Sequence, residues 1–409
     1  MTRTRVPWLL LLPFCAAVSA AQPPPPQSGR AGAAPGPADA FASFDRFFDA
    51  RLADQGIVGG SFVLLRDHRI VHARTFGFAD LQARRPIDAD TIFHWASITK
   101  TFTAIGVMQL RDRGLLSLDD PIVKYVPELR QVHNPYGPMD AITLRMLMSH
   151  SAGFRNPTWP WGGDQDWHPF EPTAWSQVAA MLPYTRIEFP PGSRYSYSNP
   201  GIVFLGRVIE RLTGDDYEVY IDKNILKPLA MHRSFFDAAP YHLRAHRSHS
   251  YFWRNGAPAG ARFDFDTGIT VSNGGLNAPL TDMAKYMDFL IGDPARQADY
   301  DGVLRRASLE EMWNPVVAVE PSEESPGGTV GLCFFLEEHG GLPFVAHSGS
   351  QNGFISHFYL SPGRRTAYVV AFNTVAEPVG PDGKGNTRLV DREVRDYVVK
   401  NLIPGPTPR

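Results

Sequence analysis

The 409-residue chain has only two cysteines, carries no excess of basic residues and contains no apolar run long enough to cross a membrane. Its 40 Lys and Arg residues nearly balance 42 Asp and Glu, and a net charge of -2 lacks the basic footprint of a nucleic-acid-binding protein. A hydrophobic content of 43% and a charged content of 20% exclude a disordered chain, a collagen-like fibre and a coiled coil. The sequence also lacks a Rossmann fingerprint and a glycine loop that would cradle phosphate, so no nucleotide cofactor is expected.

The first twenty residues have the pattern of an export signal. Arg3 and Arg5 precede a short apolar run at 8–17, and small residues at 18–20 form a cleavage site. The run has roughly half of the ~20 residues that a membrane-spanning helix needs. We therefore expect a signal peptide at 1–20 and a periplasmic or secreted protein without a stable membrane span. A retained membrane anchor is the less favoured alternative.

Two further segments are expected to lie outside the folded domain. Residues 21–38 are rich in Pro, Gly and Ala and predict a linker, and residues 403–409 predict a short tail. Removal of the signal would also remove Cys15, which leaves Cys333 alone and excludes an internal disulfide. Because Cys333 lies in an apolar run, we expect a buried strand residue rather than a nucleophile.

Hydrophobic periodicity predicts an α+β fold over residues 39–402. The first helix is expected to use Asp39 as its N-cap and to end near Gly56. The other predicted helices lie at 98–113, 143–149, 174–182, 201–213, 281–290 and 386–402, and the predicted strands at 60–65, 70–76, 330–337, 342–347, 354–360 and 366–373. Strands from both ends of the chain most simply form one antiparallel sheet, flanked by the N- and C-terminal helices. We expect a sheet lobe at about 39–115 and 315–402, an inserted and mostly helical lobe at about 116–314, and a small-molecule site between them.

Ser97-Ile98-Thr99-Lys100 is the first candidate for chemistry. Residues i and i+3 share one side of a helix, so Ser97 and Lys100 can face the same cavity. The apolar helix that follows would bury the amine of Lys100, and burial favours the neutral form that accepts a proton. Of seven lysines, only Lys100 has Ser three positions earlier. For this pair alone, the alternative is a helix N-cap followed by a surface lysine.

Two further motifs follow later in the chain. Tyr197 is the only one of fourteen tyrosines with Asn two residues later, at Asn199. A phenol near a lysine can shuttle a proton, and the amide can bond the lysine and a substrate carbonyl; alone, this triplet also suits a capping turn. His347-Ser348-Gly349-Ser350 ends a predicted strand, and its glycine would let a substrate approach the backbone closely. The same spacing at His339-Gly340-Gly341 predicts a hairpin turn instead.

In this order, Ser-x-x-Lys, Tyr-x-Asn and His-x-Gly resemble the motifs of the serine β-lactamase and DD-peptidase superfamily, specifically its class C-like branch of serine hydrolases. The stretches 143–153, 274–276 and 281–284 are also similar to that family. The resemblance covers about residues 40–402. It implies the α+β fold of the superfamily and covalent catalysis through an acyl-enzyme.

The resemblance implies that Ser97 is the acylated nucleophile, while Lys100 and Tyr197 handle its proton. The backbone N–H groups of Ser97 and Ser350 would form the oxyanion hole. Asn199 would orient the lysine and the substrate, and His347 would line the oxyanion hole. Gly349 completes the predicted site as the residue that lets a substrate approach the backbone closely. The resemblance leaves open whether the lysine or the tyrosine takes the first proton.

The third motif departs from enzymes specialised as class C β-lactamases, which carry Lys-Thr-Gly where this chain has His-Ser-Gly. Lysine is a cation suited to a substrate carboxylate, whereas histidine is mostly neutral at pH 7. His347 therefore resembles the DD-peptidase, D-aminopeptidase and esterase-like relatives. We expect an exported, cofactor-free serine hydrolase that acts on an ester, an amide or a β-lactam-like substrate. The alternatives are a class C-type β-lactamase and a catalytically idle protein that binds peptidoglycan or a partner.

Two other clusters are candidates for binding. The aromatic segment 159–175 would either overhang the cleft or pack on its own lobe. His242, His246 and His249 lie in a polar loop without supporting carboxylate spacing, so we expect no metal there.

Overall fold

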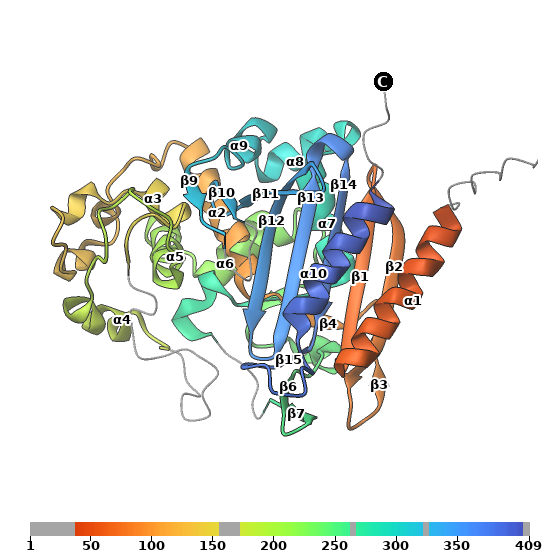
Figure 1. Ribbon diagram of the computed structural model, residues 1–409. Coiled ribbons are helices and arrows are strands. Elements are labelled where there is room, and N and C mark those ends of the chain that lie inside the picture. The colour runs from red at the N-terminus through yellow and green to blue at the C-terminus, as the bar shows by residue number, and fades with distance from the viewer. Residues whose placement is uncertain (1–36, 155–171, 262–266, 322–326, 404–409) are drawn as a thin grey trace, which may run out of the picture.

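The computed structural model describes residues 37–154, 172–261, 267–321 and 327–403. A nine-stranded antiparallel sheet forms the centre of this part of the chain, with the strand order β3-β2-β1-β14-β13-β12-β11-β10-β9 (Figure 1). Its strands are β1 (Gly59–Arg66), β2 (Arg69–Asp80), β3 (Arg85–Pro86), β9 (Val317–Val319), β10 (Gly328–Val330), β11 (Phe335–His339), β12 (Leu342–Gln351), β13 (Phe354–Ser361) and β14 (Thr366–Phe372). Strands from the two ends of the chain meet where β1 pairs with β14, which confirms the predicted α+β fold with a single large antiparallel sheet.

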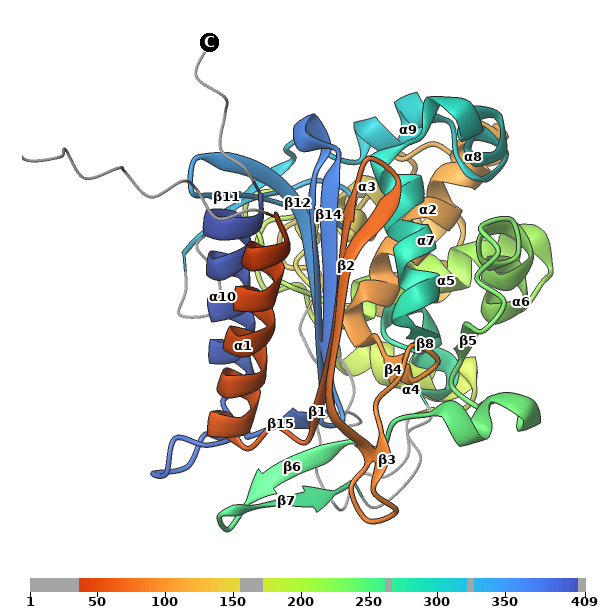
Figure 2. The same cartoon turned by 90° about the vertical axis from the view of Figure 1, so that its right-hand side faces the viewer.

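Helices α1 (Pro37–Gln55) and α10 (Thr387–Tyr397) cover one face of the sheet, and Figure 2 shows them together on that side. A π-helical turn, Val398–Leu402, extends α10. Phe44 and Phe48 of α1 are completely buried in the core on this face, as their helical spacing predicts. Within the described residues, no helix combines the length and the apolar character needed to cross a membrane.

The other face of the sheet carries the larger part of the helices (Figure 2). Among them, α7 (Leu280–Ile291) packs on β1 and β14, and α2 (Thr99–Asp112) packs against α5 (Asn199–Thr213). The remaining helices are α3 (Leu144–Met148), α4 (Trp175–Met181), α6 (Tyr217–Ile221), α8 (Gln297–Val303) and α9 (Arg306–Glu311). Two small sheets lie outside the large one: β4 (Ile92–His94), β8 (Leu276–Pro279) and β5 (Phe235–Phe236) form the first, and β15 (Thr374–Val375), β6 (Tyr251–Arg254) and β7 (Ala257–Gly260) form the second. Every residue of α2 from Thr99 to Leu110 is buried, so this helix is enclosed by protein on all sides.

Two local predictions are wrong. Helix α1 already begins at Pro37, because proline suits the first turn of a helix, so Asp39 lies inside the helix rather than at its N-cap. The strand expected over 330–337 is broken, because the chain turns inward at 331–334 between β10 and β11. Cys333 is buried as expected, but it lies in this turn with φ 61° and its N–H donates to the carbonyl oxygen of Met148 at 2.8 Å.

Several predicted segments lie outside the described residues. They are the signal peptide at 1–20, the linker up to residue 36, residues 159–171 of the aromatic segment, and the tail from residue 404. Residues 37 and 38 of the predicted linker belong to α1, and Trp175 of the aromatic segment begins α4.

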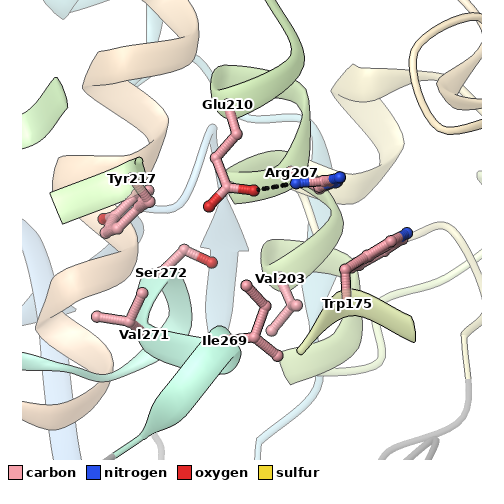
Figure 3. Close-up of a pocket in the computed structure, with 9 residues that line it drawn as sticks. Trp175, Val203, Arg207, Glu210, Tyr217, Ile269, Val271 and Ser272 are labelled. Atoms are coloured by element: carbon pink, nitrogen blue, oxygen red, sulfur yellow. Dashed lines mark hydrogen bonds and ion pairs between the residues drawn. The ribbon is translucent and has the colours of Figure 1, made fainter. Parts of the chain in front are cut away.

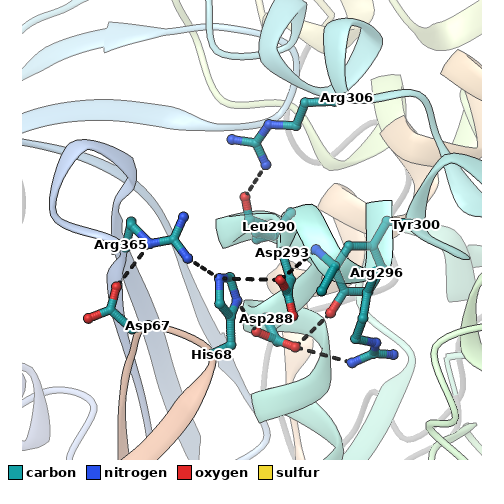
Figure 4. Close-up of polar contacts among 10 residues, drawn as sticks. Asp67, His68, Asp288, Leu290, Asp293, Arg296, Tyr300, Arg306 and Arg365 are labelled. Atoms are coloured by element: carbon teal, nitrogen blue, oxygen red, sulfur yellow. Dashed lines mark hydrogen bonds and ion pairs between the residues drawn. The ribbon is translucent and has the colours of Figure 1, made fainter. Parts of the chain in front are cut away.

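A network of polar contacts connects two hairpin turns of the large sheet, between β1 and β2 and between β13 and β14, to helix α7 (Figure 4). In the turn between β1 and β2, His68 Nδ1 lies 2.8 Å from Asp288 Oδ1, and Asp67 accepts a hydrogen bond from Arg365 at 2.9 Å. Tyr300 of α8 donates to the same Asp288 carboxylate at 2.6 Å. These contacts fix the position of the sheet relative to the helices on this face. A site between the sheet and these helices depends on that position.

Candidate active site

Ser97 and Lys100 lie where the chain enters the buried helix α2. Ser97 belongs to the short 3₁₀ turn Ala96–Ile98 and remains partly exposed, whereas the side chain of Lys100 is fully buried. Lys100 Nζ lies 2.9 Å from Ser97 Oγ and donates to the carbonyl oxygen of Asn273 at 2.6 Å. The structure therefore brings this predicted pair together, with the serine facing outward and the lysine behind it.

The surroundings of Lys100 favour the uncharged amine. Burial lowers the pKa of Lys100 from 10.5 to about 7, because an ammonium group loses the water that would solvate it. A neutral amine at 2.9 Å can accept the Ser97 proton, while one of its own N–H groups still bonds Asn273. The two contacts thus fix the direction of the nitrogen lone pair.

The carbonyl of Asn273 is held in place from α2. Thr103 donates to the adjacent carbonyl oxygen, that of Ser272, at 2.6 Å, and the Thr103 hydroxyl is 2.7 Å from the hydroxyl of Tyr217. A small pocket lies beside this anchor, between α5 and the segment 269–272 (Figure 3). The described residues that line the pocket are Trp175, Val203, Gly206, Arg207, Glu210, Tyr217, Ile269, Val271 and Ser272, a set that does not include the predicted nucleophile.

Tyr197 lies next to this pair, in the loop before α5. Its ring centroid is 5.0 Å from Lys100 Nζ, and its phenol is close enough to Ser97 for the serine hydroxyl to affect its pKa. Burial raises the pKa of Tyr197, and the Ser97 hydroxyl acts in the opposite direction. The phenol therefore keeps its proton at neutral pH and lies within reach of the serine oxygen.

Among the described residues, Asn199 forms no hydrogen bond with Lys100. It is the first residue of α5, which Ser198 caps by accepting the Gly201 N–H at 3.2 Å. Asn199 Oδ1 is buried and has no hydrogen-bond partner in the described part of the chain, whereas Lys100 bonds Ser97 and Asn273. The backbone carbonyl of Asn273 thus takes the role that sequence reasoning assigned to the side-chain amide.

His347 is a neutral, buried member of the site. It lies within β12 rather than at its end, and only 1% of it is exposed. Its Nδ1 lies 2.7 Å from the Ser348 carbonyl oxygen and must carry the proton there, so the buried Nε2 is an acceptor, and it has no partner among the residues that the structure describes. Burial and then the charge of Lys100 lower the pKa of His347 to about 3. His347 therefore supplies no positive charge at neutral pH.

Gly349 lets β12 lie against the turn that carries the serine. A Cβ atom at this position would lie 2.2 Å from the carbonyl oxygen of Trp95, so another residue would push the strand away. The pairing of β12 with β11 extends from Leu342 to Ala346, and the part of β12 beyond it faces the Ala96–Ile98 turn. Ser350 follows Gly349, and its Oγ accepts a hydrogen bond from Arg388 at 3.2 Å.

Sequence reasoning missed His150, which adjoins Tyr197. Its ring centroid is 4.4 Å from that of Tyr197, and its Nδ1 accepts the Ser198 N–H at 3.2 Å. The only sequence signal was its place in the stretch 143–153, which contributed to the family resemblance without indicating a role.

Metal-ligand side chains do not gather in the part of the chain that the structure describes: no group of three or more His, Cys, Asp or Glu residues is placed to hold an ion. Of the three clustered histidines, His242 and His246 belong to the 3₁₀ turn Tyr241–His246, and His249 Nδ1 lies 3.7 Å from Asp80.

A buried lysine bonded to a reachable serine, with a tyrosine beside both, is an arrangement that can activate the serine as a nucleophile, as serine hydrolases require. A model of the β-lactamase family matches residues 44–392, and the chain belongs to that family. Esterase EstB of Burkholderia gladioli is 30% identical over 215 residues, which are 49% of this chain and 54% of that protein. The chain spans between about half and two thirds of the length of the curated relatives it matches.

Two solved structures illustrate the shared fold. A class C β-lactamase superposes with a TM-score of 0.71 at 19% identity, covering 90% of this chain and 98% of that chain. The D-amino acid amidase of Ochrobactrum anthropi SV3 gives a TM-score of 0.72 at 21% identity, covering 89% and 98%. The family model over residues 44–392 confirms the predicted family resemblance, and these two structures confirm its fold.

Proposed function

We propose that this chain is an exported hydrolase that transfers the acyl group of an ester or amide to Ser97 and then to water. One observation carries the proposal: the 2.9 Å contact between Ser97 Oγ and Lys100 Nζ, made by an amine whose pKa burial lowers to about 7. A base whose pKa is close to the working pH combines a sufficient neutral fraction with a strong tendency to accept a proton.

Lys100 is the better first base of the two candidates, because the pKa of Tyr197 is raised and its phenol stays protonated. As Ser97 Oγ bonds to the substrate carbonyl carbon, the serine proton passes to Lys100 Nζ and the carbonyl oxygen becomes an oxyanion. The backbone N–H groups of Ser97 and Ser350 bind this oxyanion. When the C–O or C–N bond breaks, the proton passes through Tyr197 to the leaving alcohol or amine. Water then attacks the acyl-enzyme, the acid leaves and Ser97 regains its proton.

Esters and amides that carry no carboxylate are the proposed substrate class. A β-lactam carries a carboxylate, and a permanent cation in the place of His347 would attract it; the pKa of about 3 leaves this imidazole uncharged. The relative from Burkholderia gladioli is an esterase, and one structural neighbour is a D-amino acid amidase, which supports short esters and D-amino-acid amides as the first substrates to compare.

A substrate panel with a nucleophile variant tests the proposal. Purified protein would be assayed with p-nitrophenyl butyrate, D-phenylalanine amide and nitrocefin, alongside Ser97→Ala. We expect ester or amide turnover above that of nitrocefin, loss of turnover in Ser97→Ala, and a fluorophosphonate adduct on Ser97 by peptide mass spectrometry. Nitrocefin turnover comparable with that of the ester would favour the class C β-lactamase alternative. A folded protein that neither labels at Ser97 nor turns over any of the three would overturn the enzymatic proposal in favour of a binding protein.

We also propose export, on the charge, apolar run and small residues of positions 1–20. Expression in a Gram-negative host followed by fractionation and intact-mass measurement tests it. The supporting result is a periplasmic protein that has lost residues 1–20, and full-length protein in the cytoplasm would overturn it.

A further inference from the structure

His150 holds the chain on both sides of Tyr197. Its backbone carbonyl oxygen accepts the Ser196 N–H at 2.8 Å, and its side-chain Nδ1 accepts the Ser198 N–H at 3.2 Å. The imidazole also lies against the phenol ring, with 4.4 Å between the ring centroids and 31° between the planes. One residue therefore contacts the two neighbouring peptide groups and the ring that together set the position of the phenol.

The backbone of His150 is held in an uncommon conformation to reach both contacts. Its φ is 54°, in the left-handed region that side-chain-bearing residues rarely adopt and that His, Asn and Asp adopt several-fold more often than others. The turn after α3 fixes it, because the His150 N–H donates to the Leu147 carbonyl oxygen at 3.2 Å and the Ser151 N–H donates to that of Met146 at 2.8 Å. Such a conformation persists only where the surrounding structure determines it, and functional sites are the common place for it.

The hydrogen bond from Ser198 also fixes the protonation of the imidazole. Because Nδ1 accepts, the ring proton is on Nε2, which is buried and has no partner in the described part of the chain. Only 1% of His150 is exposed, and burial, followed by the charge of Lys100, holds its pKa well below 6.5. The ring is therefore neutral, and its Nδ1 acceptor is available throughout the pH range in which Lys100 titrates.

We infer that His150 is a positioning residue that orients the Tyr197 phenol toward Ser97 by holding Ser196, Ser198 and the phenol ring together. The inference rests on the proposed role of Tyr197 in proton transfer. His150 acts through Tyr197, and a displacement of about 1 Å in such a group is enough to slow a reaction roughly a hundredfold.

Two substitutions separate the acceptor from the ring. His150→Asn retains an acceptor near the position of Nδ1 and tolerates a positive φ, whereas His150→Phe retains a flat ring without the acceptor. With p-nitrophenyl butyrate, we expect His150→Phe to lower kcat roughly 10- to 100-fold with KM within about threefold of wild type, and His150→Asn to recover most of kcat. If His150→Phe does not fold, His150→Gln is the second variant without an acceptor at the Nδ1 position and carries the same expectation.

The matched control is His339→Phe, which changes a buried histidine that pairs with Glu337 at 2.7 Å in the core under α10. It should lower the thermal midpoint and leave kcat per folded molecule unchanged. A second comparison places His150→Phe in a Tyr197→Phe background, where no further loss of kcat is expected because the group to be positioned is gone.

Three outcomes would overturn the inference about His150 and leave the proposed function of Tyr197 in place. The first is an equal loss of kcat on adding His150→Phe to wild type and to Tyr197→Phe, and the second is His150→Asn performing no better than His150→Phe. The third is a normal kcat in His150→Phe while Tyr197→Phe is impaired, which refutes the role of His150 alone. If instead Tyr197→Phe keeps the wild-type kcat, the proposed function of Tyr197 fails and the inference fails with it.

Discussion

Replacing Lys100 by methionine should remove a pH-dependent contribution to stability, and the size of that contribution measures the cost of burying the ammonium form. Methionine fills a similar volume without a charge. A pKa of about 7 in place of 10.5 means that burying the ammonium form costs roughly 5 kcal/mol relative to water. The substitution also removes the hydrogen bonds to Ser97 and Asn273, a loss of about 1 kcal/mol each that does not depend on pH.

The direction of the effect follows from proton binding. Between pH 7 and pH 10.5 the folded wild type binds fewer protons at Lys100 than the unfolded chain does, so its free energy of unfolding rises with pH across this window. From pH 6 to pH 9 the expected rise is roughly 2.5 kcal/mol, and below pH 7 the full penalty is present. Lys100→Met has no such term, so its stability relative to wild type should be highest at pH 6 and fall by that amount at pH 9.

Urea unfolding of both proteins at pH 6, 7, 8 and 9 measures this difference, in which the titration of all other groups cancels. Lys124→Met is the control, because Lys124 is exposed and its pKa is raised by the hydrogen bond to Asp120. That residue stays protonated in both states up to pH 9, and its variant should differ from wild type by the same amount at every pH. A stability difference for Lys100→Met that does not change between pH 6 and pH 9 would refute the reasoning about Lys100.

Two further predictions concern activity. The value of kcat/KM for an ester should rise with pH through a midpoint near 7, because Lys100 accepts the Ser97 proton only when it is neutral; a rate independent of pH between 5.5 and 8.5 would contradict this. Gly349→Ala should lower kcat at least tenfold, because its Cβ would lie 2.2 Å from the Trp95 carbonyl oxygen, whereas Gly363→Ala, where a Cβ meets nothing within 4 Å, should behave as wild type in the same assay.

The sequence predicts the parts of the site that depend on short-range spacing. Ser97 and Lys100 are three residues apart at the start of a helix, and this periodicity is enough to put them on one side. The hairpin turn at His339-Gly340-Gly341 was correctly separated from the His347 motif by the same kind of local reasoning, since β11 and β12 pair on either side of it.

Contacts that depend on backbone atoms brought together from afar could not be predicted in this way. A carbonyl group belongs to every residue, so nothing in the side chain of Asn273 indicates that its oxygen binds Lys100. The same limit applies to His150, whose carbonyl oxygen and ring bind a segment almost fifty positions later in the chain. It also applies to Asn199, because the carbonyl oxygen of Asn273 takes the place of its expected hydrogen bond to the lysine. The break at 331–334 was missed because an apolar run does not indicate where a chain turns inward.

Three buried residues near Lys100 depart from local backbone preference, and their presence beside the predicted nucleophile is an argument about function. Ala96, which precedes the serine, has φ 48°, and His150 and Cys333 have φ 54° and 61°, although side-chain-bearing residues lose about 1 kcal/mol or more in this region. All three are buried, and the same neighbourhood holds a lysine whose pKa burial lowers to about 7 and two histidines that each have a ring nitrogen without a partner among the described residues. A sequence selected for stability alone would remove these features one by one, since each is locally unfavourable. These unfavourable features surround the partly exposed hydroxyl of Ser97. Their presence is expected if the stability of the large sheet and of the enclosed helix α2 offsets the cost of burying the base Lys100 beside this nucleophile.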